Sequence, residues 1–387
     1  MDSFDRDVWC LLGLPLDALT LPQSVAQIRA AAASRTRCFV STPNLNFLVT
    51  AGADAEFRES VIDSDLSLAD GMPLVWLSRV LGLPIRERVA GSDVFEVLRR
   101  PSAPSGERAP APRALRVFFF GGPEGAAEQA CARLDGETGN LRCAGWHFPG
   151  FASVEAMSND DVLAKINASG ADFLVVSLGA RKGQDWIFRN LPRLRVPVVS
   201  HLGAVVNFLA GSVSRAPEWM RRTGLEWLWR IKEEPALLGR YMRDGLAMLR
   251  LVLTRVAPSV AWRWWRQVQA GARRNVCVVV KVRAADANDD GTLPSRTTDT
   301  GCRVALAGAL LTGHLEPVRQ AFREAVAGGL DVTVDLNDVT DLDGAFLGLL
   351  MLLRKELRAA GHWLRIETAS AKVRWLFRLN AAAYLLE

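Results

Sequence analysis

Asp70 is the first residue whose type and setting could do chemistry. It stands in the stretch SLADGMPLVWLS, before Gly71 and Pro73, where an apolar run ends and a second begins. This is the pattern of a helix N-cap, whose carboxylate accepts a backbone N–H, but the same carboxylate could carry out acid–base chemistry. Thr42 and Asn44, in the stretch STPNLN, are either turn formers or polar contacts for a substrate. The residues alone leave both alternatives open.

Two further motifs have weaker chemical signals. The turn FGGPEG, with Gly121 and Gly122, opens an expected helix and could cradle a phosphate through its backbone N–H groups. It matches neither G-x-G-x-x-G nor a Walker loop, so a conformational role for the glycines is favoured. The triplet DSD at Asp63–Asp65 is similar to the D-x-D by which many glycosyltransferases hold a metal. It precedes its strand, so we interpret it as a solvated turn and predict no metal site.

The elements that must position these residues alternate between strand and helix from the N-terminus to about Ser212. This alternation predicts a doubly wound, Rossmann-like α/β domain over residues 1–212, with an exposed Pro- and Ala-rich loop at 101–114. In such a sheet, ligands bind beyond the carboxyl ends of the strands. We therefore expect five turns to converge on one cleft: STPNLN, LADG, RVAGSD, FGGPEG and LGARKGQDW.

The remaining chain divides into two further parts. Residues 213–270 are expected to form a basic helical appendage, and residues 271–387 a small α/β domain that contains a polar loop at 284–301. Thirteen Lys or Arg residues but only five acids lie between Ser212 and Arg274, together with six of the twelve tryptophans. Such helices are typical of membrane-surface segments. A solvated helical face with buried tryptophans is the alternative, and no nucleic-acid-binding signature accompanies the stretch.

The sequence also indicates in which cellular compartment the protein is expected. The N-terminus lacks the basic start and apolar core of a signal peptide. The apolar tract Gly245–Trp262 is interrupted by Arg250, Arg255 and Pro258, so no membrane span is expected. The six cysteines include no C-x-x-C pair and do not cluster with the four histidines. This favours a reducing, cytoplasmic compartment and argues against a zinc site or a disulfide framework.

Seven motifs, in order, resemble those of one family. They are STPNLNF, SLADGMPLVW, RERVAGSDVF, FFFGGPEGAAEQA, DFLVVSLGARKGQDWI, the stretch from LGAVVNF to RIKEEP, and GRYMRDG. Together they resemble the WecG/TagA/CpsF glycosyltransferases, over Val8 to about Met248. The resemblance implies an inverting transfer of a sugar, often N-acetylmannosamine or a related hexose, from a UDP-sugar to a polyprenyl-diphosphate-linked sugar in cell-surface or exopolysaccharide biosynthesis.

The same resemblance implies roles for single residues. Asp70 matches the general base, which would take the proton from the acceptor hydroxyl. Thr42 and Asn44 match pocket residues, and Arg88 matches an arginine that could neutralise the departing diphosphate. The other implied substrate-binding positions are Gly91, Asp93, Gly121, Gly122, Gly179, Lys182, Gln184, Arg215, Arg230 and Arg240. The last three belong to an appendage that resembles an active-site lid.

Two departures from the family pattern bear on the choice of sugar. Leu237 stands where the family usually has an arginine, and Gly183 stands where it usually has glutamine, with Gln184 one position later. No cofactor is predicted, and a divalent metal is not expected to be required. The implied partners are a UDP-sugar, a polyprenyl-diphosphate-linked glycan and the inner face of the cytoplasmic membrane, with no nucleic acid. The alternative is a catalytically inactive sugar-nucleotide sensor.

The C-terminal segment VTVDLNDVTDLDGAFLGLLMLLRKELRAAGHWLRI resembles a STAS domain. The phosphoacceptor serine of such domains follows an aspartate, whereas here Gly344 and Ala345 follow Asp343. Neither residue can be phosphorylated, so a serine switch is not expected at this position. The resemblance instead implies docking of a protein partner or self-association.

Overall fold

The computed structural model describes residues 2–101, 113–270, 279–284, 301–368 and 370–387. Most of the expected loops 101–114 and 284–301 lies outside this part of the chain. Two compact units are formed: a larger unit of Leu19–Trp76 and Ile85–Ala247, and a C-terminal unit of Met1–Ala18, Leu77–Pro84 and Met248–Glu387. These bounds differ from the expected ones, because the first 18 residues and the end of the appendage group with the C-terminal unit.

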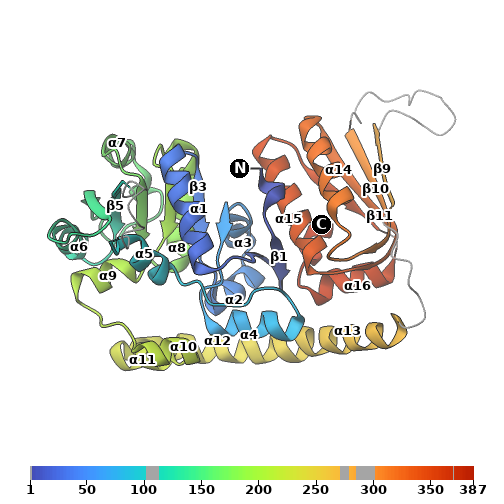
Figure 1. Ribbon diagram of the computed structural model, residues 1–387, viewed down its shortest axis with the longest axis horizontal. Helices are drawn as coiled ribbons and strands as arrows, with labels where there is room; N and C mark the ends of the chain where they lie inside the picture. Colours follow the sequence, from blue (N-terminus) through green and yellow to red (C-terminus); the bar gives the residue numbers. More distant parts are fainter. Residues whose placement is uncertain (1, 102–112, 271–278, 285–300, 369) are drawn as a thin grey trace, which may run out of the picture. The chain divides into compact units, whose positions relative to one another are not determined.

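A six-stranded parallel sheet forms the centre of the larger unit (Figure 1). In spatial order its strands are β4 (Leu66–Ser67), β3 (Cys38–Ser41), β8 (Val198–His201), β7 (Phe173–Ser177), β5 (Leu115–Gly121) and β6 (Leu141–His147). All neighbouring pairs are parallel, so every carboxyl end lies on the same edge. The predicted doubly wound architecture is confirmed.

Helices cover both faces of this sheet. Consecutive residues of a strand point to opposite faces, so each strand contributes side chains to two apolar cores. Val117 and Phe119 of β5 belong to one apolar core, and Phe118 and Phe120 belong to the other. The first core is shared with α1 (Leu21–Ser34), α5 (Gly91–Arg99), α6 (Ala126–Asp135) and α9 (Val205–Ala210), and the second with α7 (Asp160–Ala168) and α8 (Ala180–Asn190). Near-continuous apolar strands are what burial on both faces requires.

Four of the five expected turns follow a strand and lie at the carboxyl edge. STPNLN joins β3 to α2 (Leu45–Ala53), and LADG joins β4 to α4 (Met72–Leu81). FGGPEG leads from β5 to α6, and LGARKG leads from β7 to α8. The fifth expectation is wrong, because RVAGSD links α4 to α5 with no strand before it. It still reaches the edge, since the backbone N–H of Val89 donates to the carbonyl of Ala69, 2.9 Å away.

The appendage begins with two short helices, α10 (Glu218–Thr223) and α11 (Glu226–Glu233). Gly224 separates them in the left-handed conformation, with φ +78°. A Cβ at Gly224 would lie 2.9 Å from the Cβ of Met72 and from the ring of Trp76 on α4. Only glycine therefore permits both this turn and this close approach to α4.

A long helix follows, comprising α12 (Leu238–Leu251), a π-helical segment (Val252–Val256) and α13 (Ala257–Ala270). The three residues expected to interrupt the apolar tract, Arg250, Arg255 and Pro258, all lie within this continuous helix. The π-helical segment and α13's first turn accommodate the proline, which is tolerated where its missing N–H is not needed. Within the described residues, Pro235–Arg266 is long and apolar enough to cross a membrane by length and composition.

The C-terminal unit contains a four-stranded sheet in the order β12 (Leu364–Glu367), β11 (Asp331–Leu342), β10 (Gly301–Leu310) and β9 (Val279–Ala284). β9 is antiparallel to β10, and the other pairs are parallel. The helices of this unit include α14 (Glu316–Ala327), α15 (Gly344–Ala359) and α16 (Ala371–Leu379) (Figure 1). This small α/β fold agrees with the architecture expected for the segment.

An N-terminal hairpin, β1 (Val8–Leu11) and β2 (Leu14–Asp17), packs against α15 in this unit. A Cβ at Gly348 would lie 2.2 Å from the carbonyl oxygen of Val8. A glycine on the helix surface therefore lets the β1 backbone lie directly on α15.

Asp343 is the N-cap of α15. Its carboxylate accepts hydrogen bonds from the backbone N–H groups of Ala345, Phe346 and Thr312. Burial raises the pKa of Asp343, although these three N–H groups and Arg266 oppose that effect. The carboxylate is thus a structural N-cap.

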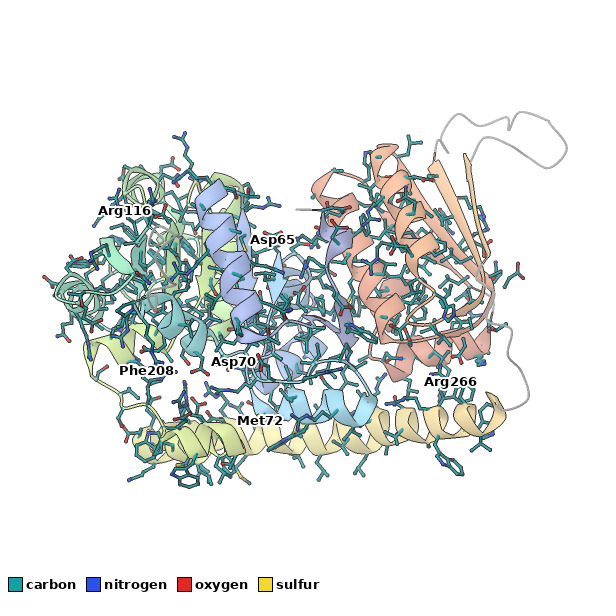
Figure 2. All side chains as sticks on the ribbon, in the orientation of Figure 1. Asp65, Asp70, Met72, Arg116, Phe208 and Arg266 are labelled. Carbon is teal, nitrogen blue, oxygen red and sulfur yellow. A yellow bond between two sulfur atoms is a disulfide. The ribbon has the colours of Figure 1, made fainter. Side chains whose placement is uncertain are left out.

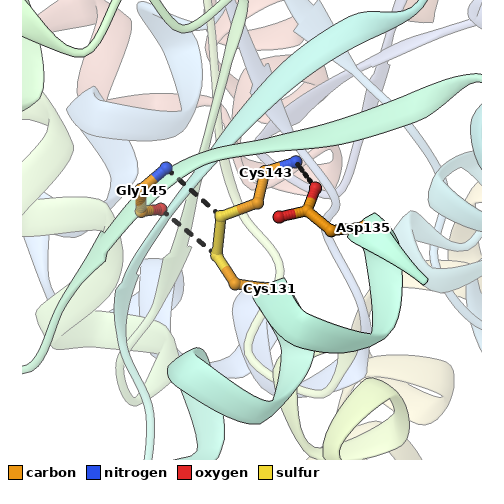
Figure 3. The surroundings of a disulfide bond; sticks show 4 residues. All are labelled: Cys131, Asp135, Cys143 and Gly145. Carbon is orange, nitrogen blue, oxygen red and sulfur yellow. Dashed lines mark hydrogen bonds between the residues drawn. A yellow bond between two sulfur atoms is a disulfide. The ribbon is translucent and has the colours of Figure 1, made fainter.

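A disulfide joins Cys131 of α6 to Cys143 of β6, with 5.1 Å between the Cα atoms (Figure 3). The expectation of a chain without disulfides is therefore wrong for this pair. The two cysteines are twelve positions apart in the sequence, so no C-x-x-C motif indicates the pair. They meet because α6 is the crossover helix between β5 and β6 and packs against β6. Cys10 and Cys302 form no disulfide among the described residues.

Candidate active site

Asp70 is held at the carboxyl edge of the sheet by backbone hydrogen bonds. Leu68 N–H donates to Ser41 O at 2.9 Å, and Asp70 N–H donates to Pro43 O at 2.7 Å. These bonds join the turn after β4 to the turn after β3. Asp70 therefore occupies a fixed position beside the neighbouring turn, although β4 itself has only two residues.

The carboxylate of Asp70 does not cap α4. Its one hydrogen bond to the described residues comes from the backbone N–H of Gly91, at 3.4 Å. Burial raises the pKa of Asp70 to about 6. Arg88, Arg230 and the Gly91 N–H oppose this rise, whereas Glu226 adds to it. A carboxylate with such a pKa is mostly ionised at pH 7 and still accepts a proton readily.

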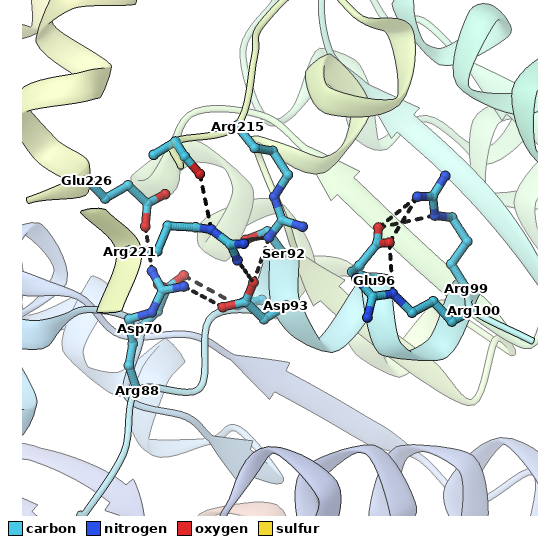
Figure 4. A network of polar contacts seen from close by, with 12 residues as sticks. Asp70, Arg88, Ser92, Asp93, Glu96, Arg99, Arg100, Arg215, Arg221 and Glu226 are labelled. Carbon is cyan, nitrogen blue, oxygen red and sulfur yellow. Dashed lines mark hydrogen bonds and ion pairs between the residues drawn. The ribbon is translucent and has the colours of Figure 1, made fainter. Parts of the chain in front are cut away.

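Arginines from three segments gather beside Asp70 (Figure 4). Arg88 donates through Nη2 to Asp93 and through Nη1 to Glu226, the latter at 2.5 Å. Arg215 Nη2 and Arg221 Nη1 both donate to Asp93 Oδ1, at 2.6 and 3.0 Å. Asp93 thus binds guanidinium groups from the 85–90 loop and from the appendage.

Arg230 completes this cluster through Glu226, with 3.7 Å between Arg230 Nε and Glu226 Oε1. The guanidinium groups of Arg230 and Arg215 also lie over the ring of Phe208, 5.8 and 5.6 Å from its centroid. Figure 2 shows Phe208 and Asp70 in the same unit. Burial would lower the pKa of Arg88, but Asp70, Glu226 and Asp93 together raise it. The cluster is therefore permanently cationic.

Thr42, Asn44 and Gly91 belong to the two segments whose backbones are hydrogen-bonded to Asp70, at Pro43 and at Gly91 itself. A Cβ at Gly91 would lie 2.3 Å from Leu202 Cδ2 and 3.2 Å from Thr42 Cγ2, so only glycine lets α5 begin here. Asn44 caps α2 through Oδ1, which accepts from Phe47 N–H at 3.1 Å. Its side-chain amide nitrogen makes no hydrogen bond to the described residues, and it can donate to a ligand hydroxyl.

Several expected site residues are not part of this network. Gln184 is buried, and its Nε2 donates to Ser41 Oγ at 2.8 Å, so its substrate-binding role stays a prediction. Lys182 donates to the carbonyl of Ala152, and Arg240 lies over the ring of Tyr241. Gly121, Gly122 and Gly179 lie in the turns after β5 and β7.

The backbone conformation at positions 121 and 122 explains why both residues are glycine. Gly121 and Gly122 both have φ +89°, and a Cβ at Gly121 would lie 2.9 Å from the carbonyl oxygen of Ser177. Both positions therefore require glycine for the backbone alone. Their substrate-binding role stays a prediction.

Three residues of the site were not singled out from the sequence. Glu226 stands four positions before Arg230, which is the spacing of a helical ion pair and could have been noticed. Arg221 and Phe208 gave no such signal, since their partners are far away in sequence. Within the described residues no group of three His, Cys, Asp or Glu side chains could hold a metal ion. The positive charge beside Asp70 is supplied by guanidinium groups.

Comparisons with known proteins identify the families to which the two parts of the chain are similar. Residues 9–260 match the family described as glycosyl transferase WecG/TagA/CpsF, and residues 295–387 match the STAS domain described as Mlab. Curated relatives carry the name N-acetylglucosaminyldiphosphoundecaprenol N-acetyl-beta-D-mannosaminyltransferase. The Bacillus spizizenii protein is 29% identical over 198 residues, covering 49% of this chain and 72% of the relative. The Staphylococcus aureus (strain MW2) protein is 24% identical over 243 residues, covering 62% and 91%.

Proposed function

The chain belongs to the WecG/TagA/CpsF family of glycosyltransferases, and from this premise we propose an inverting transfer with a defined donor and acceptor. The donor is a UDP-sugar, with N-acetylmannosamine or a related hexose as the sugar. The acceptor is a sugar carried on polyprenyl diphosphate, as in the names of the relatives. The product belongs to a cell-surface or exopolysaccharide. The observation that carries this proposal is Asp70. Its carboxylate does not cap α4, has a pKa of about 6, and lies beside an arginine cluster.

Asp70 acts as the general base in this proposal. As the acceptor hydroxyl attacks the anomeric carbon, its proton moves to the Asp70 carboxylate while the bond from that carbon to the diphosphate oxygen breaks. Attack from the side opposite the leaving group inverts the anomeric configuration. The Asn44 amide, next to Asp70, is placed to orient a sugar hydroxyl.

The arginine cluster stabilises the departing nucleoside diphosphate. Arg88 and Arg230 both act electrostatically on Asp70, yet neither forms an ion pair with it among the described residues. The sugar ring would separate base and leaving group, so a gap between carboxylate and guanidinium groups suits the reaction. Fixed guanidinium groups stabilise charge that develops on diphosphate oxygens.

The long helix supports binding at a membrane surface, which we propose to be the cytoplasmic face because the family resemblance implies it. Large apolar side chains recur along it at spacings of mostly three or four residues and are exposed: Leu238, Met242, Leu246, Leu249, Leu253, Val260, Trp264 and Val268. Other positions pack inward, as Asp244 does against Asn46. A helix with one packed face and one exposed apolar face suits a position in the plane of a bilayer. We therefore propose peripheral binding rather than a span.

The STAS domain is proposed to dock a partner protein or a second copy of the chain. A catalytically inactive sensor is the alternative function. It is not favoured, because Asp70 forms no ion pair among the described residues, and its one hydrogen bond, from the N–H of Gly91 at the start of α5, is long at 3.4 Å. So weak a contact is a poor structural reason to bury a carboxylate.

A transfer assay tests the proposal. The full-length protein is incubated with a panel of UDP-sugars and a short-chain prenyl-diphosphate-linked N-acetylglucosamine, and the product mass is measured. Asp70→Asn should bind UDP as the parent does but lose about 10²- to 10⁴-fold in transfer rate, the usual contribution of a general base. Asp161→Asn, an exposed change on α7, is the matched control. Absence of transfer by the parent protein from every UDP-sugar would contradict the proposal.

A further inference from the structure

Glu226 connects the appendage to the arginines of the site. It lies in the first turn of α11, and its side chain is 22% exposed. Oε2 accepts from Arg88 Nη1, and Oε1 pairs with Arg230 Nε four residues later. The Glu226 carboxylate thus binds two guanidinium groups that both act electrostatically on Asp70. Its contact with Arg88 is drawn in Figure 4.

Asp93, unlike Glu226, lies on a helix that packs on the sheet. It lies in the first turn of α5, which is part of the sheet-packed core, and it pairs with Arg88, Arg215 and Arg221. Its removal would leave three guanidinium groups without their shared partner. Glu226 is carried by the short helix α11, in which no residue is buried. Of the two carboxylates, Glu226 is the one that can leave without dismantling the site.

We propose that Glu226 occupies the diphosphate position of the ligand-free site and gives way when the diphosphate of a nucleotide-sugar binds. This inference rests on the proposed function, since it requires a donor that carries a diphosphate. Carboxylate and phosphate oxygens compete for the same N–H groups, because a guanidinium fork fits both. Arg88 and Arg230 would then pass from Glu226 to the donor.

The charge balance favours exchange over simple addition. Four guanidinium groups, those of Arg88, Arg215, Arg221 and Arg230, face three carboxylates, those of Asp70, Asp93 and Glu226. The diphosphate of a nucleotide-sugar adds two negative charges. With Glu226 in place, negative charge would exceed positive charge in a partly buried site, which is unfavourable. With Glu226 displaced, the charges balance.

Exchange also links donor binding to the base. The negative charge of Glu226 raises the pKa of Asp70. In Glu226→Gln that contribution disappears, so Asp70 should ionise at lower pH in the free enzyme. The acid limb of kcat/KM, which reports the free enzyme, should move to lower pH. A residue that only supported α11 would not produce this shift together with tighter anion binding.

Calorimetric titration of the full-length protein with pyrophosphate, and separately with UDP, tests the exchange. Glu226→Gln should bind both about two- to fivefold more tightly than the parent, the range expected when one partly exposed ion pair no longer has to be broken. Glu233→Gln is the matched control, since Glu233 is exposed on the same helix and should leave affinity unchanged. Glu226→Asp keeps the charge and should bind close to the parent.

The outcomes separate this inference from the proposed function. Unchanged or weaker binding of pyrophosphate by a folded Glu226→Gln protein would show that Glu226 only holds the arginines in position. That result would overturn the exchange. Failure of the parent to bind either pyrophosphate or UDP would overturn it as well. Tighter pyrophosphate binding without transfer from any UDP-sugar would contradict the proposed function but support the exchange.

Discussion

Replacing Asp70 with asparagine should abolish transfer and stabilise the fold. In the folded protein burial raises the pKa of Asp70 from 3.8 to about 6. Holding this carboxylate ionised in the folded state therefore costs about 3 kcal/mol relative to the unfolded chain. Asparagine is neutral, nearly the same size, and can still accept from the Gly91 N–H. It should remove most of that cost above pH 6.

The stabilisation of the fold by Asp70→Asn should increase as pH rises. Below pH 3.8 Asp70 is protonated in both states, so it makes no difference to the free energy of unfolding. As pH rises from 3.8 to about 6, the unfolded chain releases the proton first, and the folded state loses stability. Above pH 6 the full cost remains. Asp70→Asn should therefore gain stability in a window centred near pH 5 and keep that gain at higher pH.

Melting temperatures of the parent and Asp70→Asn between pH 4 and pH 8 measure this effect. A gain of 3 kcal/mol corresponds to a rise in Tm of at most about 6–12 °C for a unit of this size. The difference should shrink towards zero at pH 4, and Asp161→Asn should show none. In the parent, kcat/KM should rise about tenfold from pH 5 to pH 7 as Asp70 ionises. Equal melting temperatures at pH 8, or a gain that persists at pH 4, would refute the assignment.

Three other substitutions test the elements around the site. Gly224→Ala should cost about 1–3 kcal/mol and raise the KM for the donor, because φ +78° and the contact with α4 exclude a Cβ; unchanged kinetics would contradict the docking of α10 and α11. Gly348→Ala should lower Tm by displacing β1 from α15, while UDP affinity stays at the parental value in the same titration. Leu246→Glu combined with Leu253→Glu should reduce cosedimentation with anionic lipid vesicles at least about tenfold, because two exposed apolar side chains become charged; equal cosedimentation would contradict peripheral binding through this face.

Much of the larger unit could be predicted because its sequence pattern is local. Strands such as CFVS and FLVVS are apolar except for their last residue, and glycine turns follow several of the strands. Parallel strands then bring Thr42, Asn44 and Asp70 together without any knowledge of contacts. The family motifs supplied Arg88, Arg215 and Arg230, which the structure gathers around Asp93 and Glu226.

What could not be predicted depends on distant contacts. Cys131 and Cys143 meet only because α6 packs beside β6, and Gly348 is open only because β1 lies on it. The stretch around Pro258 was expected to be helical, but its π-helical segment at Val252–Val256 was not predicted. Gln184 matched a binding motif only after a shift of one position, and on a helix that shift turns the side chain by about 100°. It points to Ser41 instead.

The pairing of Arg88 explains how one site can hold both a base and a cationic cluster. Had Arg88 formed a direct ion pair with Asp70, the pKa of that carboxyl would fall by about one to three units, and Asp70 would accept a proton much less readily. Instead Asp93 and Glu226 bind Arg88, and burial keeps the pKa of Asp70 at about 6. Loss of the Asp93 carboxylate should therefore harm the base as well as the cluster, because Arg88 would turn towards Asp70. An Asp93→Asn protein should show its acid limb at lower pH together with a lower maximal rate, whereas an unshifted limb would mean that Arg88 keeps its place without Asp93.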